Sequence, residues 1–154
     1  MNKVERNTMS LKLRELGLQD FSYRITIPTR WGDNDMLGHL NNVVYHRFIE
    51  TLVVRFMIEE AGVDWINDPA SPQAVESLCR FHRPLSFPDV IDGGLLVEKI
   101  GTSSVTFGAA LFGPNDETAA ATGHFVDVFV DPSTLKSVPM TDEKRAIFER
   151  YLVG

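Results

Sequence analysis

The sequence has little of what disulfide-bonded, zinc-binding or membrane-spanning proteins need. Cys79 is its one cysteine, so no disulfide can form within the chain and a reducing compartment is expected. The same count excludes zinc sites built on several cysteines. The longest apolar runs fall well short of the ~20 residues that span a bilayer, and residues 1–10 lack the apolar segment of a secretory signal. We therefore expect a cytoplasmic protein that is not bound to a membrane.

Basic residues are also scarce. The chain has 15 Lys and Arg against 21 Asp and Glu, a formal net charge of −6. Such a chain offers no general attraction to nucleic acid, so no nucleic-acid partner is expected. A polyphosphate ligand would have to be held by a few local cations against the overall field. The sequence contains neither a glycine-rich phosphate loop nor a serine nucleophile elbow.

What the chain does have is the size and apolar content of one globular domain. It has 154 residues, of which 44 % are hydrophobic, and a chain of this length buries roughly two-thirds of its unfolded surface. We expect an N-terminal arm over residues 1–20 and a single domain over residues 21–154. The apolar residues of the arm, which would form a short helix or a packed segment, are Leu11, Leu13, Leu16 and Leu18.

Residues 43–61 carry a clear helical pattern. Apolar side chains recur there at intervals of three and four, and others extend the apolar surface beyond one stripe. A helix that is apolar over most of its girth is usually enclosed by other structure. Asn41 or Asn42 is suited to cap its start, and Gly62 is suited to end it.

Strands are predicted before and after this helix in the sequence, and residues 64–72 are expected to be a loop. The predicted strands cover residues 21–29, 75–85, 90–100, 104–112 and 118–130. Thr141 is expected to cap a short final helix. One enclosed helix followed by four consecutive antiparallel strands is an α+β arrangement, and a curved meander wrapping the helix is the simplest form of it.

The polar stretch between the first strand and the long helix draws attention for its chemistry. A helix start presents unpaired backbone N–H groups and the positive end of a dipole, which would polarise a carbonyl group placed there. Asp35 lies seven residues before Asn42. On composition alone, Asp33 and Asp35 are interpreted as residues that cap turns. Their spacing is not that of a calcium loop, so no metal site is expected.

Three segments carry a resemblance to a known family. Residues 31–45 read WGDNDMLGHLNNVVY and continue as HRFIE, residues 79–107 read CRFHRPLSFPDVIDGGLLVEKIGTSSVTF, and residues 128–140 read VFVDPSTLKSVPM. This pattern resembles the 4-hydroxybenzoyl-CoA thioesterase-like group of hotdog-fold acyl-CoA thioesterases. The resemblance covers most of residues 21–152, and the first segment is its most specific part.

The resemblance implies a hotdog fold that hydrolyses acyl-CoA to a free acid and coenzyme A. Asp35 matches the family's catalytic carboxylate, which acts as nucleophile or general base. The Asn42 N–H matches the oxyanion donor. For Asp33 the structural interpretation is kept. His39 either orients water, the thioester or Asp35, or fixes the loop; hydroxybenzoyl-specific members lack a His here, so 4-hydroxybenzoyl-CoA itself is not the expected substrate.

Substrate-binding residues are expected around this centre. Asn41 would cap the helix or lock the loop, and Tyr45 and Phe81 would line an acyl pocket, whereas Phe48 is interpreted as core. The groups expected to hold coenzyme A are Arg80, Arg83, Lys99 and Lys136, with Gly101, Thr102 and Ser103 as donors in a turn. No cofactor is expected beyond coenzyme A as part of the substrate.

The remaining expectations concern the oligomeric state and two alternatives to acyl-CoA hydrolysis. Hotdog domains pair their sheets edge to edge, with each active site between two protomers, so the resemblance implies a homodimer or homotetramer. A free sheet edge points the same way. A non-catalytic acyl-CoA-binding protein and an acyl-thioester hydratase stay open as alternatives, since a fold does not fix a function. The acyl chain and the choice between coenzyme A and acyl carrier protein are not encoded in any pattern found.

Overall fold

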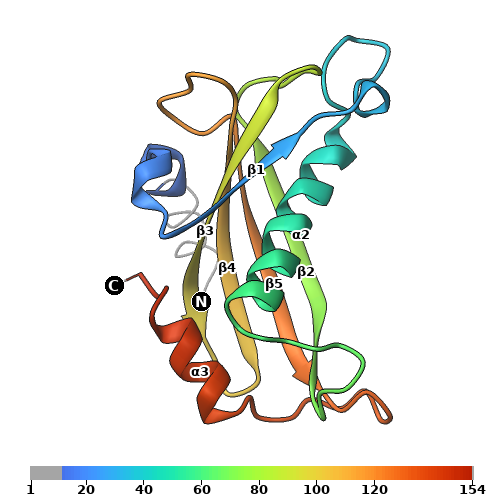
Figure 1. Ribbon diagram of the computed structural model, residues 1–154, viewed down its shortest axis with the longest axis vertical. Coiled ribbons are helices and arrows are strands. Elements are labelled where there is room, and N and C mark those ends of the chain that lie inside the picture. The colour runs from blue at the N-terminus through green and yellow to red at the C-terminus, as the bar shows by residue number, and fades with distance from the viewer. Residues whose placement is uncertain (1–11, 154) are drawn as a thin grey trace.

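A computed structural model describes residues 12–153 as one curved antiparallel sheet with a long helix against one face (Figure 1). The strands are β1 (Tyr23–Pro28), β2 (Ser71–Phe81), β3 (Val90–Ile100), β4 (Ser104–Phe112) and β5 (Ala121–Val130). The helices are η1 (Leu18–Asp20), η2 (Trp31–Asp33), α2 (Asn42–Glu59) and α3 (Asp142–Glu149). The predicted α+β arrangement is confirmed. Among the described residues, no helix is long and apolar enough to cross a membrane.

The strand order β1-β3-β4-β5-β2 corrects one part of the expected topology. Strands β3, β4 and β5 form the predicted meander, but β2 lies at the far edge beside β5. The segment 82–89 therefore crosses the end of the sheet from one edge towards the other (Figure 1). This crossing places the segment beside the polar loop that precedes α2.

Strand β2 also begins earlier than expected, at Ser71, within the range predicted to be a loop. Pro72 misled the prediction, because proline cannot donate a ladder hydrogen bond. It is tolerated here because β2 is an edge strand with one unpaired side. The strand also ends earlier, at Phe81.

Helix α2 is enclosed on its apolar side by the concave face of the sheet, which we call the inner face. Its buried residues are Val44, Tyr45, Phe48, Ile49, Leu52, Val53, Phe56 and Met57. Gly93 and Gly123 let the helix approach closely, since a Cβ on either would come within 3 Å of Leu52 or Ile49. Phe48 belongs to this core, as its sequence pattern indicated.

The opposite, outer face of the sheet is covered by the N-terminal arm. Residues 12–15 form a helical turn, and Leu13 and Phe21 are buried against β3 and β4. Leu11 lies outside the described residues. Figure 1 shows this arm and α2 on opposite sides of the sheet. The arm is therefore part of the packed domain from residue 12 onwards.

A buried contact between Glu98 and His124 crosses the outer face beneath the arm. Glu98 Oε2 lies 2.6 Å from His124 Nδ1, and the side chain of Glu98 passes over Gly108 to reach it. A Cβ at Gly108 would come within 2.5 Å of Glu98 Oε1. Only a glycine on β4 leaves space for this contact between β3 and β5.

Candidate active site

The loop between β1 and α2 is anchored by Asp33. Its side chain is 1 % exposed and accepts hydrogen bonds from the Arg30 backbone N–H at 2.8 Å and from Arg47 of α2 at 2.5 Å. Its carbonyl accepts from the N–H of Asn41. Burial raises the pKa of Asp33, but the bonds from Arg47 and Arg30 outweigh it, so the pKa is lowered. An ionised carboxylate thus ties the loop to the helix.

Asp35 begins a tight turn that folds its carboxylate back towards the helix. The Gly38 N–H donates to the Asp35 carbonyl at 3.1 Å, and the Asp35 N–H donates to the His39 carbonyl at 2.9 Å. Gly38 has φ +80°, a conformation that glycine adopts without strain. The Leu37 N–H donates to Asp35 Oδ1 at 2.9 Å. One oxygen of the carboxylate is therefore fixed by the turn.

The crossing segment holds this loop from the other side. The Leu40 N–H donates to the Leu85 carbonyl at 2.7 Å, and the Phe87 N–H donates to Asn34 Oδ1 at 3.0 Å. The Ser86 hydroxyl donates to the Gly38 carbonyl at 3.1 Å. Because both ends of the turn are bonded, its geometry is set before any ligand arrives.

The start of α2 faces the same space. Asn41 is the N-cap, as its side-chain oxygen accepts from the Val43 N–H at 3.1 Å. Asn42 is the first helical residue, and the N–H of a first helical residue has no acceptor within its own helix. The helix therefore offers a donor and the positive end of its dipole at Asn42.

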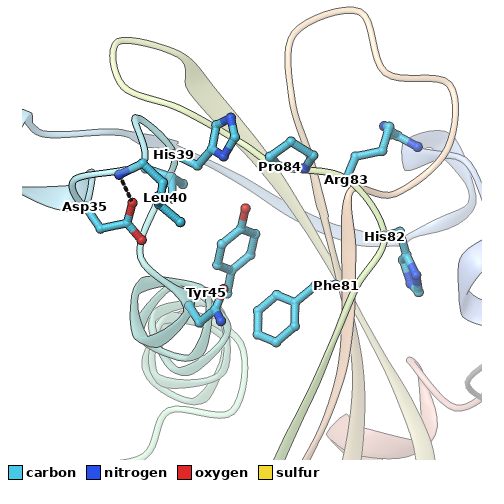
Figure 2. A pocket seen from close by; sticks show the side chains of 10 residues that line it. Asp35, His39, Leu40, Tyr45, Phe81, His82, Arg83 and Pro84 are labelled. Atoms are coloured by element: carbon cyan, nitrogen blue, oxygen red, sulfur yellow. Dashed lines mark hydrogen bonds between the residues drawn. The ribbon is translucent and has the colours of Figure 1, made fainter.

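These groups line one cavity of about 360 Å³ (Figure 2). Its lining consists of Asp35, Leu37, His39, Leu40, Asn42, Tyr45, Phe81, His82, Arg83 and Pro84. Figure 2 shows the Asp35 carboxylate on the side of the helix start, with Tyr45 and Phe81 across the cavity from it. The arrangement can hold a polarisable carbonyl between a carboxylate and a helix N-terminus, against an aromatic wall.

The aromatic wall is rigid. Tyr45 and Phe81 pack edge to face with ring centroids 5.1 Å apart, and the Tyr45 hydroxyl accepts from the Leu85 N–H at 2.9 Å. Burial raises the pKa of Tyr45. The hydroxyl is therefore neutral at ordinary pH and fixes the crossing segment to α2.

The structure brings together some of the residues selected from the sequence and separates others. Asp35, His39, Asn42, Tyr45, Phe81 and Arg83 line the cavity, and Asn41 caps the helix beside it. Arg80 lies on the outer face, since its partner across the sheet is Thr122. The turn Gly101–Ser103 lies at the opposite end of the sheet, where the Gly101 and Thr102 carbonyls accept from Arg145 of α3.

Sequence reasoning missed two contributors, Arg47 and His82. Arg47 occupies a helix position that looks like an ordinary exposed cation, and only the fold shows that it meets Asp33. His82 follows a strand end, and its ring is hydrogen-bonded to Thr122 Oγ1 at 2.9 Å. Burial lowers the pKa of His82, and the positive charges of Arg14, Arg83 and Arg80 lower it further.

Within residues 12–153, the structure shows no group of three or more His, Cys, Asp or Glu side chains that could hold a metal ion.

Comparison with known proteins agrees with this architecture. The family model of the thioesterase-like superfamily matches residues 29–148. The PA5185 protein of Pseudomonas aeruginosa is 35 % identical, with a TM-score of 0.83 over 88 % of this chain and 95 % of that one. The PA2801 protein of the same organism, a candidate thioesterase, is 30 % identical, with a TM-score of 0.75 over 82 % and 97 %.

The same fold occurs in a more distant structure, a thioesterase from Thermus thermophilus crystallised with coenzyme A and zinc. That protein is 22 % identical, with a TM-score of 0.74 over 85 % of this chain and 94 % of that one. No curated protein sequence matches the chain. The predicted hotdog fold is confirmed by these neighbours. The family model alone spans most of the chain, and the chain belongs to the thioesterase-like superfamily.

Proposed function

We propose that this protein hydrolyses acyl-CoA thioesters to a free acid and coenzyme A. The observation that carries the proposal is the meeting of Asp35 and the N-terminus of α2, at Asn42, in one cavity. Thioester hydrolysis needs an oxygen nucleophile and a group that stabilises negative charge on the carbonyl oxygen. The leaving thiolate is stable enough that no strong general acid is required.

Asp35 would supply the first need by one of two routes. Its carboxylate oxygen attacks the carbonyl carbon, the C–S bond breaks to release thiolate, and water then cleaves the resulting anhydride. Alternatively, the carboxylate takes a proton from a water that attacks the same carbon. In both routes the carbonyl electron pair moves onto the oxygen that faces the Asn42 N–H, a donor worth about 3 kcal/mol of barrier.

Coenzyme A is the proposed carrier. The Thermus thermophilus neighbour with this fold was crystallised with coenzyme A. The cavity supports the same assignment, because one side carries the carboxylate and the other carries Arg83. A guanidinium group is suited to phosphates.

A homodimer is the proposed working unit. Strand β2 is the last strand of the sheet, so one side of its backbone is unpaired, and an unpaired edge is a template for another strand. Phe81, at the end of this strand, is 47 % exposed, and Met36 in the active-site turn is 97 % exposed. Pairing of two β2 edges would cover apolar surface at the mouth of the cavity. Sedimentation velocity tests this: a monomer at assay concentrations contradicts it.

The test of the proposed activity is thiol release from a panel of acyl-CoAs, with wild type, Asp35→Ala and Asp35→Asn compared. Asparagine keeps an oxygen that can accept from the Leu37 N–H, so Asp35→Asn removes the charge and preserves the turn. We expect both variants to lose about 10²- to 10⁴-fold in kcat while still binding substrate. Asp142→Asn, at the start of α3, is the remote control.

Two outcomes would overturn the proposal. Binding of acyl-CoA by wild type without thiol release would indicate an acyl-CoA-binding protein. A change in acyl-chain absorbance without thiol release would indicate a hydratase. Full activity of Asp35→Asn would leave thioesterase activity in place and remove Asp35 from it.

A further inference from the structure

The phenolic hydroxyl of Tyr45 has a hydrogen-bond donor to spare. Its oxygen accepts from the Leu85 N–H at 2.9 Å, and a phenol can donate its own hydrogen at the same time. Within residues 12–153, no group accepts that hydrogen. The side chain is 3 % exposed, and a buried donor without an acceptor is costly. Tyr45 is therefore suited to donate to a molecule that enters the cavity.

The helix aims this hydroxyl towards the centre of the site. Tyr45 follows Asn42 by three residues, so the two lie one turn apart on one face of α2. Helical side chains lean towards the N-terminus of their helix, and Tyr45 therefore extends towards the end of α2 that carries the Asn42 N–H. Figure 2 shows the hydroxyl end of the ring directed towards the loop of His39 and Leu40. Both donors line the cavity that also holds Asp35.

Three contacts fix the position of the hydroxyl. Phe81 packs edge to face against the Tyr45 ring, with centroids 5.1 Å apart, and the Leu85 N–H holds the phenolic oxygen. The Leu85 carbonyl in turn accepts from the Leu40 N–H at 2.7 Å, which ties Tyr45 to the loop of Asp35. Since the Leu85 N–H points at the oxygen, the hydroxyl hydrogen is turned away from it. A donor fixed in this way is what stabilisation of a developing charge requires.

The hydroxyl stays protonated and lies across the cavity from Asp35. Burial raises the pKa of Tyr45 more than the bond from the Leu85 N–H lowers it, and the negative charge of Asp35 adds to the rise. The phenol is therefore a hydrogen-bond donor at ordinary pH and not a proton-transfer group. Figure 2 shows the Asp35 carboxylate on the other side of the cavity. An acyl carbonyl placed between the two has a carboxylate on one side and a donor on the other.

We propose that the Tyr45 hydroxyl is a second oxyanion donor, which binds the thioester carbonyl oxygen together with the Asn42 N–H. This inference rests on the proposed function and adds a catalytic residue to it, whereas the sequence indicated Tyr45 only as a wall of the acyl pocket. When an oxygen of Asp35 or of water bonds to the carbonyl carbon, the C=O π pair moves onto the carbonyl oxygen. The hydrogen bond from Tyr45 then strengthens, and the phenol keeps its proton. The pair returns as the C–S bond breaks and thiolate leaves.

The experiment compares ligands with and without a carbonyl oxygen. One is an acyl-CoA analogue in which a methylene group replaces the thioester sulfur, so it keeps the carbonyl and releases no thiol. The other is the S-alkyl-CoA of the same chain length, which has no carbonyl. Their Kd values are measured by calorimetry for wild type, Tyr45→Phe and Tyr23→Phe, together with kcat and KM for the matching acyl-CoA. Tyr23→Phe is the matched control, because it removes a hydroxyl that donates to Glu59 and does not line the cavity.

We expect Tyr45→Phe to lower kcat about 10²- to 10³-fold, the loss typical of one oxyanion donor, with KM changed less than about threefold. The ketone analogue should bind about three- to tenfold more weakly, because a neutral carbonyl gains less from the bond than an oxyanion does. Binding of the S-alkyl-CoA and the pH–rate profile should stay as in wild type. Tyr23→Phe should leave all four quantities at wild-type values.

Equal weakening of the two analogues by Tyr45→Phe would overturn the inference, because the loss would then come from displacement of the crossing segment at Leu85. An unchanged kcat would overturn it as well. A shifted pH–rate profile would also do so, because it would place the hydrogen bond on Asp35. Failure of the proposed function is distinguishable. If wild type releases no thiol but Tyr45→Phe selectively weakens binding of the ketone analogue, the carbonyl donor stands and the hydrolase assignment fails.

Discussion

Arg47 of α2 donates to the buried carboxylate of Asp33, with Nη2 and Oδ1 2.5 Å apart. The bond joins the second turn of the helix to the η2 segment, two residues before Asp35. Asp33 and Arg47 are not among the residues that line the cavity. Their bond nevertheless fixes the distance between two groups that do line it, the Asp35 carboxylate and the start of α2 at Asn42. Together with the bonds from the crossing segment, the pair fixes the position of the loop relative to α2.

Removal of Asp33 should cost both stability and activity. Asp33→Ala leaves Arg30 and Arg47 without their acceptor, and we expect a loss of about 2 to 3 kcal/mol in the free energy of unfolding, less than for a fully buried pair because Arg47 is half-exposed. The measurement is urea denaturation with parallel assays of thiol release. Arg55→Ala, which breaks an exposed ion pair with Glu59 on the same helix, should cost less than 1 kcal/mol. Equal losses for the two variants would contradict the proposed role of Asp33 in tying the loop to α2.

The lowered pKa of Asp33 also makes the stability of the folded protein depend on pH. Its pKa is lowered in the folded protein, so its contribution to stability is full above the unfolded pKa near 4 and is lost as pH falls through the lower folded value. The Asp33→Asn variant should therefore show a flatter decline of stability below pH 4 than wild type. Acid titration of unfolding, followed by circular dichroism, is the measurement.

The Asn42 N–H can be removed without removing the helix. Asn42 is the first helical residue, where proline is tolerated, and Asn41 has φ −59° and ψ 141°, the conformation preferred before proline. We expect Asn42→Pro to lower kcat about 10²- to 10³-fold with the helix intact. Asn42→Ala, which keeps the N–H, should retain most of the activity. Similar rates for the two variants would exclude this N–H as the oxyanion donor.

Asp127 should make the protein less stable as pH rises through neutrality. It is buried on the inner face, and burial together with the charge of Glu50 raises its pKa to about 7. The folded protein therefore holds a proton that the unfolded chain releases near pH 4, and the free energy of unfolding falls between those values.

The Asp127→Asn variant tests this directly. At pH 8 it should be more stable than wild type by about 2 to 4 kcal/mol, and at pH 4 the two should be similar. Thermal unfolding across that range is the measurement. Asp131→Asn, four residues along the chain, is the control, since hydrogen bonds to Ser133 lower its pKa and its titration ends below this window. Parallel pH profiles for wild type and Asp127→Asn would refute the prediction.

Cys79 should be almost inert in the folded protein. Burial raises the pKa of its thiol to about 11, and only the thiolate reacts with disulfide reagents. At pH 8 we expect labelling by a chromogenic disulfide about two orders of magnitude slower than in guanidinium chloride. Labelling at equal rates in both conditions would contradict the burial. The practical benefit is a low background in thiol-release assays.

The sequence predicted the elements well wherever one physical signal dominates. The apolar periodicity of α2 and the alternation in β3 and β4 gave bounds within a residue or two of those observed. The position of β2 was not predictable in this way, because its pairing with β5 rather than β3 depends on how the whole sheet closes around the helix. Pro72 concealed its start for the same reason, as only an edge strand tolerates it.

In the candidate site, too, residues with a local sequence signal were predictable and contacts between distant segments were not. Asp35, Asn42 and Tyr45 lie within one short segment, so their motif was visible in the sequence, and the structure places all three on one cavity. The contacts of Arg47 and His82 connect distant segments and have no local signature. The turn at Gly101 carried a sequence signal of a turn alone, and in this chain its carbonyls bind α3.

The bulge in β2 has a consequence for insertions and deletions. The pairing of β2 with β5 shifts register between Ala74 and Glu76, so Val75 is an extra residue that the bulge absorbs without exchanging the faces of the stretch that follows. Alternation along a strand means that a change of one residue exchanges the two faces. If Val75 were paired in regular register with the first pairs of the strand held, the later residues would exchange faces and the ring of Phe81 would turn towards the arm. Deletion of Val75 would instead join Ala74 to Glu76 in regular register, so this position tolerates the loss of one residue and the aromatic wall stays in place.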